Sequence, residues 1–238
     1  MNTGENIKIE RVPLWQRIVP RVLESIAWYP TRILLRVFLR MKVNKYFKIT
    51  KEEVDRPILF ISNHISELDP ILTTMATSPF NTIFPLFWVS KAGREYKDPD
   101  FSWRKYIYGD LFFLAWGAQP LTSKVKNYEM SLKRHSWLLK HGYSVCIFPE
   151  RGYSNKSRGI GGGAGFLMEA WNPLVIPVKI EGIEGITQRE FWGRRRGLRV
   201  TFGKALEPKD YLDSNLPAPE RYKDAIKKIF KTIDYEIN

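Results

Sequence analysis

The chain has 238 residues but only one cysteine, and this shortage excludes several kinds of stabilisation and chemistry. A single thiol cannot form an intramolecular disulfide, and it cannot build a zinc site from several thiolates. Cys146 lies in the apolar run 145–148, so we interpret it as a small buried side chain in a strand. A fold without disulfides is suited to a reducing compartment.

Long apolar runs are also lacking. The longest stretch without a charged residue, 70–90, contains three prolines and several Ser, Thr and Asn residues. We interpret it as a buried helix, a turn and a strand, because prolines and polar side chains at this density are unsuited to a membrane span. The N-terminus lacks the apolar core and the cleavage site of a signal peptide. We therefore expect no conventional membrane-spanning segment.

Acidic residues are too few to balance the basic ones: 25 Asp and Glu stand against 38 Lys and Arg, a net charge of +13. Such an excess predicts an anionic partner, which can be a membrane surface, a nucleic acid or a phosphorylated small molecule. Eight Trp and fourteen Phe favour the membrane, because aromatic and basic side chains together suit the bilayer interface. The chain has no recognisable nucleic-acid-binding motif, and its basic residues lie beside apolar helical patterns, so we expect no nucleic-acid partner.

The N-terminal segment carries much of this charge. Residues 11–48 contain nine Lys or Arg and one acidic residue, and their apolar positions recur at helical spacing. Pro20 and Pro30 interrupt the pattern, which predicts two short helices rather than one. We predict that residues 1–48 form an amphipathic helical pair that anchors the protein in the headgroup region, followed by a domain over residues 49–238. The alternative is the same pair packed on the domain, with a solvated basic face.

From residue 43 onward, short apolar runs alternate with amphipathic patterns, which is typical of an α/β layered domain. The expected strands are 43–50, 57–61, 84–90, 143–148, 174–180 and 198–202. Residues 64–77 are expected to form a turn and then a helix, and the other expected helices are 102–116, 124–140, 161–171 and 222–235.

A histidine and an aspartate stand five positions apart, at His64 and Asp69, directly after the apolar strand 57–61. Histidine has an unperturbed pKa of about 6.5, so it can accept a proton at neutral pH. A nearby carboxylate holds the ring in one tautomer and stabilises the imidazolium that forms. The pair suits the deprotonation of an alcohol that then attacks an acyl group. About one histidine in twenty meets an aspartate at this spacing by chance, so the pair needs supporting motifs.

Supporting motifs follow in order along the chain. Residues 148–154, Phe-Pro-Glu-Arg-Gly-Tyr-Ser, come after a predicted strand. Residues 175–178 form a later predicted strand with an internal proline, and residues 200–204 are the third motif. Together with residues 63–69 they resemble the glycerolipid acyltransferase superfamily, which includes the 1-acylglycerol-3-phosphate and other lysophospholipid acyltransferases. Residues 63–69 resemble its HxxxxD block, 148–154 its FPEGTRS acceptor-binding block and 175–178 its apolar block. The resemblance covers roughly residues 55–205.

The resemblance implies a mixed α/β sheet flanked by helices and a membrane-associated O-acyltransferase. His64 is then the general base on the acceptor hydroxyl, and Asp69 orients and stabilises it. The donor is an acyl thioester of coenzyme A or of acyl carrier protein, with no covalent acyl-enzyme, no metal and no further cofactor. The expected partners are an anionic membrane surface, a lysophospholipid and the acyl carrier. The expected location is the cytoplasmic face of a membrane, with the protein peripheral or monotopic.

The acceptor-binding block departs from the family pattern. Where the family has Gly-Thr-Arg after the glutamate, this chain has Arg151 followed by glycine and tyrosine, so the arginine that would hold an acceptor phosphate is missing from its usual place. Arg151 or Arg158 is the expected substitute, because guanidinium matches phosphate geometry. In the second block, Ser123 with Lys124 beside it stands where the family has arginine, and lysine is a less directional phosphate ligand.

The substrate-binding residues that the resemblance implies are Glu150, Arg151, Ser154, Arg158, Lys91 and Lys124. The favoured acceptor is 1-acylglycerol-3-phosphate, while another lysophospholipid or a non-phosphorylated lipid alcohol stays open. A non-catalytic member of the fold that binds acidic membranes is a further alternative, which the altered block motivates and the intact His64 and Asp69 oppose.

Two further features keep more than one interpretation. Residues 194–196 are three arginines that follow the aromatic pair 191–192, a cluster that suits lipid headgroups, the acidic surface of a carrier, or a solvated loop. His135 and His141 lie in or at the end of a Lys-rich helix, where we expect them to be solvated.

Overall fold

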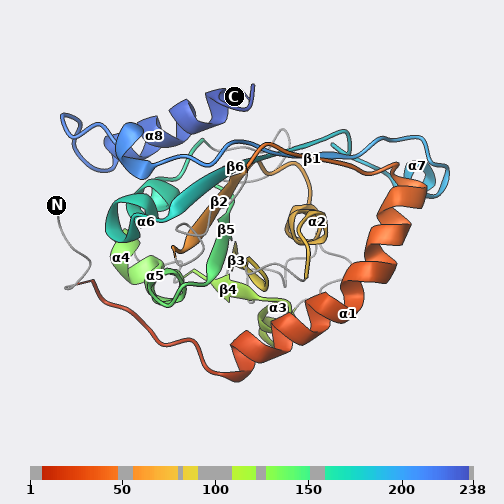
Figure 1. The fold of residues 1–238 in the computed structure, drawn as a ribbon, viewed down its shortest axis with the longest axis horizontal. Helices are drawn as coiled ribbons and strands as arrows, with labels where there is room; N and C mark the ends of the chain where they lie inside the picture. Colours follow the sequence, from red (N-terminus) through yellow and green to blue (C-terminus); the bar gives the residue numbers. More distant parts are fainter. Residues whose placement is uncertain are drawn as a thin grey trace.

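The computed structural model describes residues 7–47, 56–79, 83–90, 109–121, 127–150 and 159–235. Within these residues the centre is a seven-stranded sheet with strand order β1-β7-β6-β2-β5-β3-β4, and helices lie on both of its faces (Figure 1). β7 is antiparallel to β6, while every other neighbouring pair is parallel. The α/β class and the mixed sheet expected from the sequence are therefore confirmed.

The strands are β1 (Lys42–Lys45), β2 (Ile58–Ser62), β3 (Leu86–Ser90), β4 (Ala118–Pro120), β5 (Ser144–Ile147), β6 (Leu174–Glu181) and β7 (Arg199–Phe202). The helices are α1 (Trp15–Phe38), α2 (Asp69–Ala76), α3 (Asp110–Ala115), α4 (Tyr128–Ser131), α5 (Lys133–Lys140), α6 (Gly163–Trp171), α7 (Gln188–Trp192), the short 3-10 helix η5 (Pro208–Asp210) and α8 (Glu220–Lys231). Among the helices that the structure describes, none combines the length and the apolarity needed to cross a membrane.

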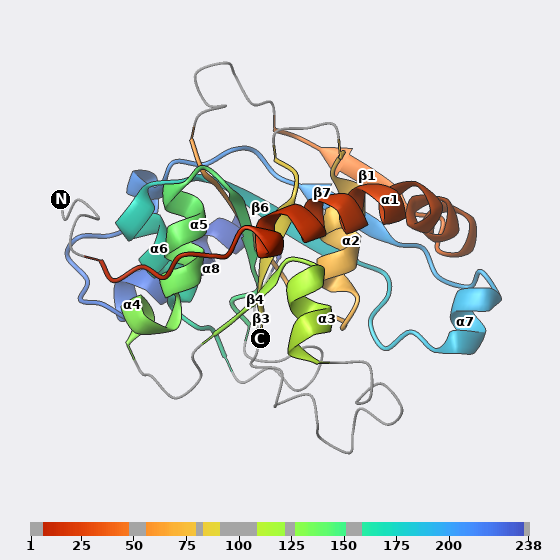
Figure 2. The same ribbon diagram turned by 90° about the horizontal axis from the view of Figure 1, so that it is seen from below.

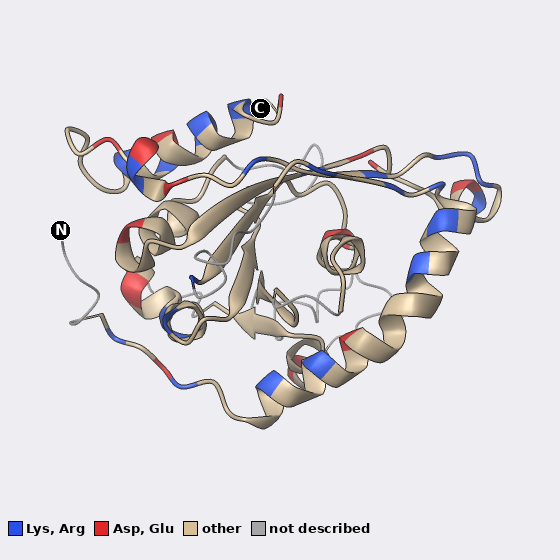
Figure 3. Ribbon diagram, in the orientation of Figure 1, with Lys and Arg blue, Asp and Glu red and all other residues tan. Residues whose placement is uncertain are grey.

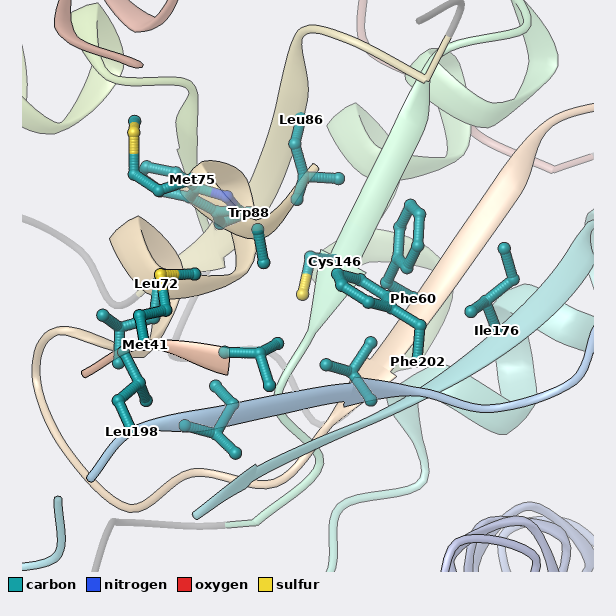
Figure 4. Packing of buried hydrophobic residues seen from close by; sticks show 14 of the residues in the cluster. Met41, Phe60, Leu72, Met75, Leu86, Trp88, Cys146, Ile176, Leu198 and Phe202 are labelled. Carbon is teal, nitrogen blue, oxygen red and sulfur yellow. The ribbon is translucent and has the colours of Figure 1, made fainter. Parts of the chain in front are cut away.

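The sheet separates two apolar cores, because its central strands are buried on both faces. In β2, Phe60 belongs to the core on the side of α1 and α2, whereas Leu59 and Ile61 belong to the core on the side of α5, α6 and α8. Figure 4 shows the first core, in which Phe60 lies near Cys146 and Phe202 from other strands of the sheet. Cys146 is fully buried with a free thiol, as its apolar surroundings in the sequence predict.

α1 is one continuous helix that contains both Pro20 and Pro30, so the prediction of two short helices was wrong. Each proline removes one backbone hydrogen bond. Packing of the inner face against the rest of the fold, including the buried Leu35, stabilises the helix across these gaps. Figure 1 shows the helix axis changing direction along its length, which prolines inside a helix commonly cause.

Several other elements also differ from the expectation. The amphipathic pattern 124–140 forms two helices, α4 and α5, which meet at Leu132, and its first residues lie outside the described part of the chain. β4 and α7 were not predicted, because elements of three and five residues are too short to show a hydrophobic period. The expected helix 102–116 is described only from residue 109, and there α3 begins at Asp110.

Candidate active site

Three neighbouring strands end at one edge of the sheet and bring the candidate site together. β2 is parallel to both β5 and β6, so Asn63, Phe148 and Ile180 lie at or just beyond the carboxyl ends of these strands. The Asn63 side chain donates to the Ile180 carbonyl at 2.9 Å and accepts from the Ile180 amide at 2.7 Å. These two hydrogen bonds to the backbone of β6 fix the start of the loop that carries His64. The Phe148 ring lies 4.9 Å from the His64 ring, centroid to centroid.

His64 and Asp69 form a hydrogen-bonded pair, with Nδ1 of the imidazole 2.8 Å from Oδ2 of the carboxylate. The same oxygen accepts from the backbone amides of Ile65 and Ser66 at 2.6 and 2.9 Å. The other carboxylate oxygen accepts from the Ser66 hydroxyl at 2.7 Å. Because an ionised carboxylate only accepts, Nδ1 of the neutral ring carries the proton and the lone pair lies on Nε2. The geometry is that of an oriented base.

The local sequence explains why this pair forms. Residues 64–68 make the turn between β2 and α2, and Asp69 is the first residue of the helix. A carboxylate is favourable there, near the positive end of the helix dipole. Pro70 follows in the first turn, where a missing N–H removes no helical bond, as the sequence predicts. The Asp69 side chain is fully buried, whereas the His64 side chain keeps 21% exposure, so a substrate can reach the imidazole.

Glu150 faces the same pair from the segment after β5. It is buried, and its backbone forms an antiparallel bridge with Ile160. Burial raises the pKa of its carboxyl, while the hydroxyl of Tyr235, the charge that His64 carries when it is protonated and the backbone N–H of His64 act to lower that pKa. Within the described residues, Oε1 of Glu150 has no hydrogen-bond partner. The structure therefore brings the carboxyl of Glu150 close to His64.

Tyr235 is a residue of the site that the sequence did not reveal. It follows α8, and its hydroxyl donates to the carboxyl of Glu150. Burial and this contact raise the pKa of Tyr235. Its ring packs edge-on to Phe230 of α8 at 5.2 Å, which carries the tyrosine from the helix into the site. The sequence offers no signal for this contact beyond an aromatic residue at the end of an amphipathic helix.

The remaining residues implied by the resemblance cannot be placed. Arg151, Ser154, Arg158, Lys91 and Lys124 lie outside the described residues, so their role in substrate binding stays a prediction. Among the residues that are described, no group of three or more His, Cys, Asp or Glu is arranged to hold a metal ion.

The other two histidines differ in their surroundings. His135 is fully buried, its Nε2 lies 3.2 Å from the Gln119 carbonyl, and burial lowers its pKa to about 4. The expectation that His135 is solvated was wrong, because this face of α5 packs against β4 rather than facing water. His141, at the end of α5, is exposed as expected.

α1 turns polar side chains toward the rest of the protein. The Trp28 indole donates to the Thr77 carbonyl at 2.8 Å, and Arg32 donates to the Met75 carbonyl. Both carbonyls lie at the C-terminal end of α2, where helical carbonyls lack partners within the helix. Figure 2 shows α1 crossing in front of α2, with α3 beside it. The polar side chains of α1 therefore attach it to the domain.

Apolar side chains of α1 point the other way. They recur every three or four residues, and the exposed fraction of each lies between 39 and 69%. This outer face of α1 consists of Trp15, Ile18, Val22, Ile26, Tyr29, Ile33, Leu34 and Val37. An exposed apolar surface along a whole helix marks an interaction site.

Comparisons with known proteins identify the family to which this fold and these motifs correspond. The sequence model of the family described as Acyltransferase matches residues 41–181. A curated relative from Mycoplasma pneumoniae, named probable 1-acyl-sn-glycerol-3-phosphate acyltransferase, is 29% identical over 157 residues. That match covers 64% of this chain and 55% of the relative, so the chain spans little more than half of the length of that protein.

A solved structure gives the same fold. The crystal structure of the 1-acyl-sn-glycerophosphate (LPA) acyltransferase, PlsC, from Thermotoga maritima matches with a TM-score of 0.53 at 14% identity, over 92% of this chain and 82% of that chain. At this identity the likeness concerns the fold alone. His64, Asp69 and Glu150 fall inside the region that the family model matches, whereas Tyr235 and the whole of α1 fall outside it.

Proposed function

We propose that this chain, which belongs to the Acyltransferase family, moves a fatty acyl group from an acyl thioester to the hydroxyl of a lysophospholipid, with His64 as general base. The observation that carries the proposal is the His64–Asp69 pair, in which a buried carboxylate with three other hydrogen bonds orients an imidazole that is open to substrate. A positioned base of this kind contributes about 10²- to 10⁴-fold to a reaction rate.

The reaction follows from the tautomer. Nε2 of His64 accepts the proton of the acceptor hydroxyl while its oxygen attacks the thioester carbonyl, and Asp69 stabilises the imidazolium. The tetrahedral intermediate then collapses, the C–S bond breaks and the carbonyl re-forms as an ester. The leaving thiolate takes the proton from the imidazolium, which returns His64 to its starting form. The Phe148 ring against the imidazole restricts its rotation through this cycle.

The preferred acceptor is 1-acylglycerol-3-phosphate. Glu150 supports an acceptor with polar groups near the reacting hydroxyl, because its buried carboxyl interacts with His64 and its Oε1 has no hydrogen-bond partner among the described residues. The excess of basic residues and the name of the Mycoplasma pneumoniae relative favour a phosphate group on that acceptor. A non-phosphorylated lipid alcohol is the alternative, because the arginine that would hold an acceptor phosphate is missing from its usual place in residues 148–154.

The outer face of α1 supports binding to a membrane from one side. A helix with polar contacts inward and an apolar face outward suits the boundary between headgroups and acyl chains. The protein then works as a monotopic or peripheral enzyme on the cytoplasmic face, where the acceptor reaches His64 from the membrane. Coenzyme A or acyl carrier protein delivers the acyl group from the aqueous side.

Acyl transfer from a radiolabelled acyl thioester to a panel of lipid alcohols tests the proposal. The panel contains 1-acylglycerol-3-phosphate, other lysophospholipids and uncharged hydroxy-lipids, each with both carriers. His64→Ala is compared with wild type and with His141→Ala, which removes an exposed imidazole at the end of α5. We expect product from wild type and His141→Ala and none from His64→Ala.

Two results would contradict the proposal in different ways. Product from His64→Ala at the wild-type rate would remove His64 as the base. No product with any acceptor and either carrier, from folded protein that binds vesicles, would favour the non-catalytic, lipid-binding alternative.

A further inference from the structure

The connection between β6 and β7 carries α7 out to the C-terminal end of α1 (Figure 1). Thr187 caps α7, and a reciprocal bond between Thr187 and Glu190 closes the cap. Glu190 also pairs with Arg196 at 2.9 Å, which fastens the chain after the helix back onto it. α7 is therefore a defined element despite its five residues.

Aromatic contacts join α7 to α1. The Phe38 ring, at the end of α1, stacks on Phe191 at 5.5 Å and meets Trp192 edge-on at 5.0 Å. Trp192 still exposes 63% of its surface. Leu34 of the outer face of α1 lies one helical turn before the half-buried Phe38, and residues four apart on a helix are neighbours on its surface, so the apolar surface of α1 continues through Phe38 to Trp192.

Arginines border this apolar surface. The Arg194 guanidinium lies 5.6 Å from the centre of the Phe38 ring, and both Arg194 and Arg195 are exposed. Within the described residues, neither arginine has an acidic side chain at ion-pair distance. The nearby Glu190 instead pairs with Arg196 and bonds to Thr187 in the helix cap. Figure 3 shows basic positions at α7 and along the nearby half of α1.

We infer that α7 and residues 193–196 form a second membrane contact, in which Trp192 enters the interface and Arg194 and Arg195 bind anionic lipid headgroups. Tryptophan beside arginine suits the boundary between headgroups and acyl chains. The contact lies beside the end of α1 and extends its outer face, so it rests on the membrane association proposed above. It adds a preference for anionic lipid that the apolar side chains of α1 do not supply.

Vesicle co-sedimentation of the full chain tests the preference for anionic lipid. Arg194→Gln/Arg195→Gln is compared with wild type on phosphatidylcholine vesicles with and without phosphatidylglycerol. The matched control is Lys227→Gln/Lys231→Gln, which removes the same charge from exposed positions on α8, away from α7 (Figure 3). A basic residue near an anionic surface contributes about fivefold in affinity at low salt, so the α7 variant should bind anionic vesicles roughly 10- to 30-fold more weakly. The control should change by no more than the loss of general charge attraction, and neutral vesicles should not distinguish the variants.

A fluorescent label tests insertion of residue 192 directly. The native chain has one cysteine, which is fully buried, so Trp192→Cys offers a single accessible thiol for an environment-sensitive dye. We expect its emission to shift to the blue when anionic vesicles are added, while the same dye at Lys227→Cys does not shift.

The outcomes separate this inference from the function on which it rests. If wild type binds no vesicles, the membrane association fails; if wild type makes no product in detergent micelles, the acyltransferase activity fails. If wild type binds anionic vesicles while the α7 double variant binds equally well, or the dye at position 192 does not respond, the second contact is overturned. Equal vesicle binding combined with a higher KM for acyl carrier protein in the α7 variant would reassign the arginines to the carrier.

Discussion

Oδ2 of Asp69 lies 2.8 Å from Nδ1 of His64 and accepts from two backbone amides at the same time. Those amides belong to Ile65 and Ser66, in the turn between the two side chains. Three donors therefore converge on one oxygen, and the backbone of the turn fixes the position of the acceptor that orients the imidazole. The five-residue spacing in the sequence is the length of this turn.

Asp69→Asn tests what the carboxylate contributes beyond orientation. Because the amides of Ile65 and Ser66 require an acceptor at the position of Oδ2, the asparagine oxygen should occupy it and keep the tautomer of His64. What is lost is the negative charge that stabilises the imidazolium. We expect kcat to fall about 10²- to 10³-fold, within the range of a general base, with the thermal midpoint lowered only slightly.

Two further variants serve as references for the kcat of Asp69→Asn. Asp69→Ala removes both charge and orientation, so its kcat should fall further and the protein should be less stable. Ser66→Ala removes one bond to the carboxylate and should have the smallest effect of the three. An Asp69→Asn enzyme as slow as Asp69→Ala would contradict the separation of charge from orientation.

The parts of this fold that the sequence predicted are those governed by local patterns. The buried central strand before His64 shows as an uninterrupted apolar run, and Pro70 marks the first turn of α2. The expectation of a mixed sheet and the role proposed for His64 came from the order of the motifs, since the pair alone arises by chance too often.

The parts that it did not predict depend on contacts between distant segments. The pattern at Pro20 and Pro30 indicated a break, but side chains of α1 bind carbonyls at the end of α2 and keep the helix continuous. Tyr235 reaches Glu150 only because α8 packs on the sheet and directs its last residues to the site. Neither contact can be predicted from the local sequence pattern.

Tyr235→Phe tests the contact between the C-terminal segment and Glu150. Loss of one hydroxyl removes a hydrogen bond with a net worth of about 0.5–1.5 kcal/mol, so we expect KM for the acceptor to rise about two- to tenfold with kcat nearly unchanged. The hydroxyl lowers the pKa of Glu150, so its removal should move the pH dependence of acceptor KM toward higher pH.

Tyr143→Phe is the matched control for this change. Tyr143 lies before β5 and its hydroxyl accepts from Arg17, at the end of the strand opposite to Glu150. Its steady-state constants should stay at wild-type values. A kcat loss in Tyr235→Phe without a change in KM would contradict a positioning role for Tyr235 toward the acceptor.

Single substitutions on the outer face of α1 test the membrane contact better than removal of the helix. Deleting residues 1–42 would take Leu35, Leu39 and Met41 out of the core, so loss of binding would be confounded with unfolding. Ile26→Ser leaves the core intact, because the Ile26 side chain is 69% exposed.

The expected effect of Ile26→Ser is a loss of vesicle affinity. Burying an isoleucine side chain is worth about 1.5–3 kcal/mol, so vesicle binding should weaken about tenfold or more while the thermal midpoint in solution is unchanged. Ile9→Ser, another exposed isoleucine but outside α1, serves as the control and should bind like wild type. Equal loss in the two variants would contradict an oriented contact through α1.

Glu24 gives a prediction about stability and pH. It is fully buried on the inner face of α1, where Oε2 accepts from the Leu86 amide at 3.3 Å and Oε1 has no partner among the described residues. Burial raises the pKa of Glu24 well above its usual range, against the effect of the Leu86 amide. In the unfolded chain a glutamate ionises at about pH 4.3. As pH rises above that value, the unfolded state loses this proton while the folded state keeps it, so the folded state becomes less stable.

Glu24→Gln removes that loss of stability, because glutamine stays neutral at every pH. The variant should match wild type below about pH 4. Its advantage in the free energy of unfolding should then grow toward neutral pH, by about 1.4 kcal/mol for each unit by which the folded pKa exceeds the unfolded one. Glu10→Gln should behave in the opposite way. Burial acts against ionisation of Glu10, but bonds from Lys133 and Arg134 lower its pKa, so its contribution to stability is present near neutral pH and disappears as the pH falls. Thermal unfolding of the three proteins across this pH range distinguishes them, and a constant difference between Glu24→Gln and wild type would show that burial does not raise the pKa of Glu24 in the folded protein.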